Sequence, residues 1–351
     1  GNETWCMIGY HAVSVLADMI VKEVKGFDYE RAYEAMKTTA MNPNYDCLPE
    51  YREMGYVPFD KEAESVSKTL EYAYDDYCIA TMAKKMGKKE IADEFYKRAQ
   101  NYRNVYNPAT SFMQPRDEKG NFAANFSPDD YTEDICESNG WQYFWSLPQD
   151  LDGLAGLVES KERFAEKLDS MFTYFPKSTE DLPIFSTGMI GQYAHGNEPS
   201  HHIPFLYAWT SQPWKTQYWQ REIMNKMYRN NIDGLCGNDD CGQMSAWYIL
   251  SSMGFYPVCP GTDQYVLGAP YLPYIKVMLE NGKTFEVKAD KVSDKNRYVK
   301  SVKLNGKPYT KGFITQQDIM DGGTLTFEMT SSPNKKRVFN GTDRPYSLSS
   351  N

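Results

Sequence analysis

The sequence predicts a mainly α-helical toroid followed by a small antiparallel β-sheet module. Two observations support this fold class. Between residues 5 and 253, apolar residues recur at helical spacing in about nine segments, which are joined by long aromatic loops containing Gly and Pro. After Gly254 the apolar period changes to two, which is typical of strands. We therefore predict a helical domain over residues 1–256, a β module over 257–338 and a polar tail over 339–351.

The strongest helical pattern covers residues 65–86. Gly87 ends it, and a second helix over residues 88–106 completes a helical hairpin. Ser65 or Ser67 is placed to cap the first of these helices. Such hairpins predict a toroid whose functional site is built from loops at one end. Other helices are predicted, among further segments, at residues 5–24, 135–145, 203–209, 214–230 and 243–253.

Five short segments in the β module favour strands. Asn281-Gly282 and Asn305-Gly306 separate neighbouring segments and are typical of two-residue hairpin turns. These turns predict antiparallel pairing. The five segments are residues 265–267, 274–279, 284–288, 298–304 and 324–329.

Composition excludes several functions. The net charge is −9 and no stripe of Lys and Arg appears, which argues against nucleic-acid binding. No apolar run approaches the ~20 residues that cross a bilayer, so we predict no membrane span. The seven cysteines form no CxxC pair and predict neither a disulfide framework nor a zinc ribbon. Aromatic residues make up 15% of the chain, which fits either a large core or a protein that stacks sugars on aromatic rings.

The first candidate for chemistry is Glu137, which lies shortly before Trp141 and Gln142 at the start of a helical stretch. A carboxyl group beside a tryptophan in a dry pocket holds its proton to higher pH, which suits a general acid. The alternative is a structural glutamate in the first turn of a helix, where the helix dipole favours its charge.

The second candidate is a histidine-rich loop over residues 195–202. It contains three of the four histidines of the chain, His195, His201 and His202. Its spacing matches no zinc motif, and Pro199 prevents a regular HExxH helix. A polar sugar site, a Ca²⁺ site with oxygen ligands, and a helix N-cap at the end of the loop all stay open.

The third candidate is the stretch GNDDCGQ over residues 237–243, directly before a predicted helix. It offers the adjacent carboxylates Asp239 and Asp240 in a turn bounded by glycines. The structural interpretation is N-capping of the following helix. The functional one is a catalytic base. Glycoside hydrolysis needs two carboxyl groups, and Glu137 together with this pair supplies them.

Five motifs in this order resemble glycoside hydrolase family 92, over residues 1 to about 334. The resemblance implies an exo-acting α-mannosidase that inverts configuration, prefers α-1,2 linkages and depends on Ca²⁺. It also implies an (α/α)6 barrel, and a periplasmic or secreted location. The five motifs are GNETWCMIGYH, SVSKTLEYAYDDYCIA, ESNGWQYFW, HGNEPSHHIPFLY and GNDDCGQMSAWYILSSMGFYPVCPG.

The resemblance also implies roles for single residues. Glu137 takes the position of the general acid, and Asp239 and Asp240 fall in the motif that supplies the base. Calcium is expected at Asn197 and Glu198. Contacts with a mannose-containing glycan are expected from one further set of residues: Trp141, Gln142, His195, Glu198, His201 and His202.

The chain departs from the family pattern in one large way. The N-terminal β-sandwich and the first barrel helices are missing, since twelve helices are expected and about nine are predicted. We therefore expect a fragment of a longer precursor whose N-terminal part is its partner. Two other functions stay open: a toroid glycosidase of different specificity, for example for α-glucosides, and a remnant that binds glycans without cleaving them.

Overall fold

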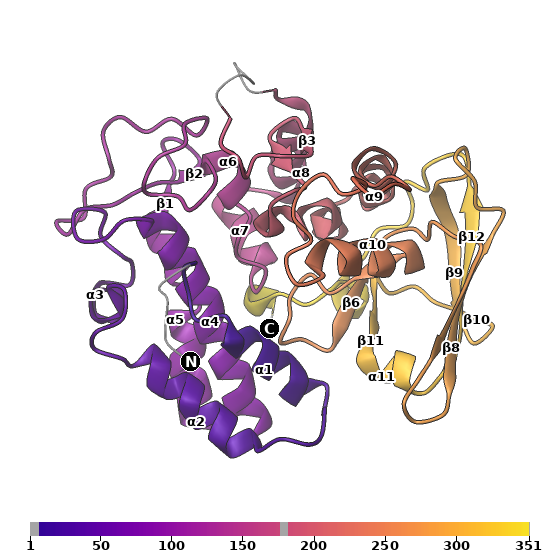
Figure 1. Cartoon of the computed structure of the whole chain (residues 1–351), viewed down its shortest axis with the longest axis horizontal. Helices are drawn as coiled ribbons and strands as arrows, with labels where there is room; N and C mark the ends of the chain where they lie inside the picture. Colours follow the sequence, from indigo (N-terminus) through magenta and orange to yellow (C-terminus); the bar gives the residue numbers. More distant parts are fainter. Residues whose placement is uncertain (1–6, 176–181, 351) are drawn as a thin grey trace. The chain divides into compact units, whose positions relative to one another are not determined.

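The computed structural model describes residues 7–175 and 182–350 (Figure 1). The chain forms two compact units. Among these residues, the first unit holds 7–158, 182–183 and 259–262, and the second holds the rest. This division differs from the boundary predicted after residue 256, because helices and strands share the second unit. Within the described residues, no helix is long and apolar enough to cross a membrane.

The first unit is built around the helix α4 (Ser65–Lys85). Most of its residues are buried, because α1, α2 and α5 pack against it (Figure 1). The helix is therefore rich in apolar and aromatic residues on all sides. Two short strands, β1 (Tyr106–Asn107) and β2 (Phe112–Met113), form a hairpin. The remaining helices of this unit are α1 (Ala12–Val21), α2 (Tyr29–Ala40), α3 (Leu48–Met54), α5 (Lys89–Arg98), α6 (Gly140–Tyr143) and α7 (Leu151–Leu157).

A buried ion pair lies inside the first unit. The Asp76 carboxylate is fully buried, 2.7 Å from the Arg98 guanidinium, and it accepts a hydrogen bond from the Tyr51 hydroxyl. Burial raises the pKa of Asp76 to about 7, against the opposing effect of Arg98. The neighbouring aspartate of α4, Asp75, faces a different partner, described below.

The helices of the second unit include α8 (Lys161–Thr173), α9 (Trp214–Met227), α10 (Gln243–Met253) and the short α11 (Gln316–Met320). The helix predicted over residues 203–209 is the 3₁₀ helix η3 (Ile203–Trp209), which starts with proline at its second position. A further 3₁₀ turn, η2 (Glu198–Ser200), precedes it. The hairpin of β3 (Met189–Ile190) and β4 (Tyr193–Ala194) leads into the histidine-rich loop.

The second unit also contains two larger sheets. The strands β5 (Phe255–Tyr256), β6 (Gln264–Leu267) and β11 (Phe313–Thr315) pair antiparallel in the order β11-β6-β5. The other sheet has the order β10-β9-β12-β8-β7. Its strands are β7 (Tyr274–Met278), β8 (Thr284–Asp290), β9 (Tyr298–Leu304), β10 (Lys307–Pro308) and β12 (Gly323–Thr330).

The prediction of a purely antiparallel module is wrong at one pair of strands. Asn281-Gly282 and Asn305-Gly306 do form hairpin turns, between β7 and β8 and between β9 and β10. However, β12 inserts between β8 and β9 and runs parallel to β8. A parallel pair needs a long connection, and the chain from β9 to β11 and α11 supplies it. Turn dipeptides report only local neighbours, so the sequence pattern could not show this insertion.

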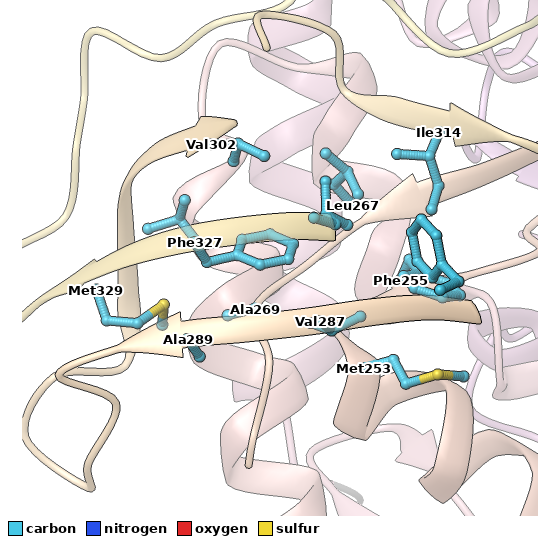
Figure 2. Close-up of a cluster of buried hydrophobic side chains, with 13 residues drawn as sticks. Met253, Phe255, Leu267, Ala269, Val287, Ala289, Val302, Ile314, Phe327 and Met329 are labelled. Carbon is cyan, nitrogen blue, oxygen red and sulfur yellow. The ribbon is translucent and has the colours of Figure 1, made fainter. Parts of the chain in front are cut away.

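One apolar core joins the two sheets and the end of α10 (Figure 2). Phe285, Val287 and Ala289 alternate with more exposed residues along β8, so one face of the strand is buried. Met253 from α10 and Phe327 from β12 belong to the same cluster. Burying an aromatic side chain such as Phe327 contributes about 2–3 kcal/mol.

The polar tail is packed rather than frayed. Phe339 and Ser347 are buried, and the Tyr346 backbone N–H donates to the side chain of Gln264 at 2.8 Å. A side chain on Gly312 would collide with the Phe339 ring, which shows how closely the tail approaches β11. The end of the chain therefore belongs to the second unit.

Candidate active site

The loop that carries Glu137 is held on the first turn of α4. The Glu64 and Val66 N–H groups donate to carbonyl oxygens of Glu133 and Asp134, at 2.6 and 3.1 Å. These bonds satisfy N–H groups that a helix start leaves without partners. Ser65 and Ser67 are therefore not needed as caps, and that prediction is wrong. Ser67 instead accepts a hydrogen bond from the Cys136 N–H at 2.9 Å.

Glu137 lies ahead of a helix rather than inside its first turn. Its backbone adopts a left-handed conformation with φ +53, and its side chain is partly buried. Asn139 caps α6 by accepting hydrogen bonds from two backbone N–H groups, both at 3.1 Å. A left-handed glutamate is uncommon and is held only where its surroundings demand it. The structural alternative of a first-turn glutamate therefore does not describe this residue.

The two neighbours of Glu137 in its motif are both fastened to the preceding loop. Trp141 donates from Nε1 to the Asp129 carboxylate at 2.9 Å, and its ring meets Phe112 edge to face. Gln142 is buried and donates from Nε2 to the Tyr131 hydroxyl at 3.1 Å. Trp141 is only partly buried, so part of its indole ring is exposed.

In the second unit, His195 is fully buried and hydrogen-bonded to two tyrosine hydroxyl groups. The Tyr228 hydroxyl donates to the Met244 carbonyl, so its oxygen accepts the proton on His195 Nε2, at 2.7 Å. Nδ1 of His195 then accepts from the Tyr193 hydroxyl, also at 2.7 Å. Burial lowers the pKa of His195 well below its ordinary value. Both ring nitrogens are thus occupied, and this histidine organises protein side chains.

His201 is neutral for the same physical reason. Its Nε2 donates to the His195 carbonyl at 2.9 Å, and its Nδ1 accepts from the Gln243 amide at 3.1 Å. Burial lowers the pKa of His201 to about 4. A neutral imidazole without a vacant lone pair cannot bind a metal ion. The structure therefore supports neither His195 nor His201 as a metal ligand.

The histidine-rich loop and the GNDDCGQ loop lie against each other within the second unit. The Trp247 indole N–H donates to the His201 carbonyl at 2.9 Å, and Gln243 bridges His201 and the Tyr256 hydroxyl. A Cβ on Gly237 would stand 2.9 Å from the Gly196 Cα, so the two backbones touch. Glycine at 237 is required by this approach.

The two aspartates of GNDDCGQ have different surroundings. The Asp239 carboxylate accepts from the Ser245 N–H at 2.9 Å and from the Ser245 hydroxyl at 3.0 and 3.1 Å. It thereby caps α10, whose N-terminus also favours its negative charge. Asp240 is exposed, with a left-handed backbone at φ +41. Within the described part of the chain, its carboxylate has no hydrogen-bond partner.

Asn197 and Glu198 stand at the start of the η2 turn. Asn197 is buried, and its side-chain Nδ2 has no hydrogen-bond partner among the described residues. The Glu198 carboxylate lies close enough to Tyr256 to help raise the pKa of that hydroxyl, after the larger effect of burial. In residues 7–175 and 182–350, no three His, Cys, Asp or Glu side chains come together as metal ligands. His202 is also buried at the end of this loop.

Several residues that organise these loops were not predicted from the sequence. In the second unit they are Tyr193, Tyr228 and Tyr256, whose only signal was the high aromatic content. In the first unit, His11 lies between two carboxylates of α4, those of Glu71 and Asp75. His11 is the one histidine outside the histidine-rich loop, and that isolation was the available clue.

A helix-rich fold with a candidate acid, candidate base carboxylates and aromatic loops fits the class of glycoside hydrolases. Residues 1–331 match the model of the glycosyl hydrolase family 92 catalytic domain, and the chain belongs to this family. The resemblance inferred from the five motifs is confirmed.

Solved structures of this family are close to the chain. It is 55% identical to a family 92 α-mannosidase from Bacteroides thetaiotaomicron, solved in complex with mannoimidazole. That match has a TM-score of 0.95 and covers 99% of this chain and 47% of the other. A family 92 inverting mannosidase of the same organism is 38% identical, with a TM-score of 0.90 and coverage of 98% and 49%.

A relative described as an uncharacterized secreted glycosidase, from Arthroderma benhamiae, is 27% identical over 90% of this chain and 44% of its own length. The chain thus spans about half the length of the relatives it matches.

Proposed function

We propose that the protein to which this chain belongs hydrolyses non-reducing terminal α-mannosides with inversion of configuration. The observation that carries this proposal is the 55% identity to an α-mannosidase across 99% of the chain. Inverting mannosidase activity in a second relative supports the stereochemistry. We further propose α-1,2-linked mannose as the substrate linkage, an (α/α)6 toroid completed by an N-terminal partner segment, and a periplasmic or secreted location.

Glu137 is the proposed general acid, which protonates the departing glycosidic oxygen. Its partly buried position on a constrained loop suits a carboxyl group that must keep its proton until the bond breaks. In an inverting reaction the base activates a water on the opposite face of the sugar, ~6.5–9.5 Å from the acid.

We assign the base to Asp240 rather than Asp239. Both oxygens of Asp239 accept hydrogen bonds from Ser245, so this carboxylate shapes the turn and caps α10. Asp240 is exposed in the same turn and keeps its lone pairs for a water molecule.

Calcium dependence is general in this family, and Asn197 with Glu198 fits such an ion. A buried amide whose Nδ2 has no partner among the described residues can turn its oxygen toward a cation, and a carboxylate lies next to it in the chain. Both are hard oxygen donors, whereas His195 and His201 have no lone pair to offer. When bound, Ca²⁺ would grip sugar hydroxyl groups. Glu198, Trp141, Gln142 and His202 are the proposed substrate contacts.

The decisive experiment compares four proteins on mannobioses and on aryl mannosides with good leaving groups. Glu137→Gln should lower kcat by about 100-fold or more on mannobiose and far less on activated aryl mannosides. Asp240→Asn should lower the rate on both substrates, whereas Asp239→Asn should lower stability more than chemistry. Equal losses for Glu137→Gln on both substrates would contradict its role as acid.

Ligand specificity separates the remaining alternatives. Release of glucose from a mixed glycan panel would indicate a toroid glycosidase of other specificity. Binding of mannobiose with Ca²⁺ but without turnover would indicate a glycan-binding remnant. Loss of activity in EDTA should be reversed by Ca²⁺, and rescue by Zn²⁺ alone would contradict the oxygen-ligand site.

A further inference from the structure

The first unit contains a cluster of charged groups beside the loop of Glu137. The His11 side chain lies between two carboxylates: its Nδ1 is 2.8 Å from Asp75 and its Nε2 is 2.9 Å from Glu71. Asp75 is fully buried and also accepts from the Tyr10 N–H at 3.0 Å. The other oxygen of Glu71 accepts from the Tyr143 hydroxyl at 2.6 Å.

This cluster continues directly to the Glu137 loop. Ser67 and Glu71 are four residues apart, so they share one face of α4. Ser67 holds the Cys136 N–H on that face. The negative charges of Glu64, Glu137 and Glu71 all act on the Cys136 thiol, whose pKa is raised first by burial and then by these carboxylates. All three carboxylates thus lie near this buried thiol.

The opposing positive charges are few. Lys68 lies 2.9 Å from Glu62 and 3.9 Å from Glu64, so it balances charge at the start of α4. Burial lowers the pKa of His11, but the Asp75 and Glu71 carboxylates outweigh it and raise that pKa well above its ordinary value. His11 is thus a cation that offsets Asp75 and part of Glu71.

We propose that Glu71 and His11 are positioning residues that set how tightly Glu137 holds its proton. This inference rests on the proposed role of Glu137 as the acid. The negative charge of Glu71 makes a second negative charge on Glu137 unfavourable, and the His11 imidazolium limits that effect. Tyr143 fixes Glu71 in place and connects it to α6, the helix that follows Glu137.

The proposal predicts opposite effects for two neutralising variants. Glu71→Gln removes a negative charge, so Glu137 should lose its proton at lower pH. His11→Gln removes a positive charge, so Glu137 should lose its proton at higher pH. Each shift should be about 0.5–1 pH unit for charges separated by several ångströms near a protein surface. A role limited to folding would not produce shifts of opposite sign.

The test is a ¹³C NMR titration of the 351-residue chain labelled at glutamate carboxyl carbons. The Glu137 signal is assigned by its loss in Glu137→Gln, and Glu90→Gln, an exposed change on α5, is the matched control that should shift nothing. If Glu71→Gln does not fold, the test is carried by His11→Gln and by Tyr143→Phe, which removes one hydrogen bond to Glu71 without changing charge. Shifts of the same sign, or below ~0.2 pH unit in both charge variants, would overturn the proposal.

A kinetic comparison distinguishes this inference from the proposed function. The basic limb of the kcat/KM profile on mannobiose should move in the same direction as each NMR midpoint. Opposite NMR shifts in a protein without mannoside hydrolysis would support the charge cluster and contradict the enzyme role. Hydrolysis with an unmoved Glu137 midpoint would support the enzyme role and contradict the cluster.

Discussion

Two histidines, one in each unit, illustrate opposite ways of holding a candidate catalytic loop. His11 lies between the carboxylates of Glu71 and Asp75, which raise its pKa, so it is a cation in the folded protein. His195 lies between the hydroxyl groups of Tyr193 and Tyr228, and burial lowers its pKa, so it is neutral. The first unit therefore organises the candidate acid with charge, and the second organises the candidate base with neutral hydrogen bonds.

The difference suits the two proposed tasks. A general acid must keep a proton, and nearby negative charge favours that state. A base must stay ionised, and the turn that carries Asp240 lies just before α10, whose N-terminus favours negative charge. The histidines His195 and His201 beside the GNDDCGQ loop are neutral and add no charge to it. The N-terminus of α10 and any bound cation therefore have the larger effect on the electrostatic potential at this loop.

The largest expected effect comes from breaking the buried charge pair of the first unit. Arg98→Met should destabilise the protein by about 3–5 kcal/mol, because it leaves the Asp76 carboxylate buried without its cation. Urea unfolding at pH 7.5 measures this change. The loss should shrink as the pH falls through the pKa of Asp76, since a protonated carboxyl needs no counter-ion. An undiminished loss at pH 5 would contradict this explanation.

Breaking the neutral chain of the second unit should cost somewhat less. His195→Phe keeps a ring beside Trp247 but leaves the buried Tyr193 hydroxyl and the partly buried Tyr228 hydroxyl without their shared partner. We expect a loss of about 2–3 kcal/mol. The loss should be constant between pH 6 and 8, because His195 carries no charge over that range. A pronounced pH dependence would show instead that the ring is protonated in the folded state.

A smaller effect is expected where the two loops of the second unit touch. Gly237→Ala places a methyl group 2.9 Å from the Gly196 backbone, and relieving that contact should cost about 1–2 kcal/mol. Gly282→Ala, at a turn glycine with no atom near its added Cβ but with φ +80, is a control for backbone strain alone. A larger loss at 282 than at 237 would contradict the importance of the close approach.

The smallest effect on stability is expected from His11→Gln, because 38% of the His11 side chain is exposed and solvent screens its ion pairs. The folded-state pKa of His11 is raised, so its stabilising contribution is complete below pH 6. It is lost as the pH rises through that raised pKa. The stability difference between wild type and His11→Gln, measured by urea unfolding from pH 5 to 10, should therefore decrease with increasing pH. A stability difference that increases with pH would contradict the assignment of His11 as a cation.

Local patterns in the sequence predicted the elements well where one physical cause dominated. The helices α4 and α10 begin where their apolar patterns begin, at residues 65 and 243. Asn-Gly turns located two hairpins of the sheet. The prediction of the helix caps was wrong, because Ser67 accepts a hydrogen bond from the Cys136 N–H, which lies 69 residues further along the chain. No window of neighbouring residues contains that contact.

The sequence by itself determined the family, the candidate acid Glu137 and the carboxylate pair at 239 and 240, because residue type and order carry catalytic motifs. Only the tertiary structure decided what each group experiences. It separated Asp239, a cap bonded to Ser245, from the exposed Asp240. It also made His11 a cation and His195 neutral, because charge and burial depend on neighbours brought together by folding.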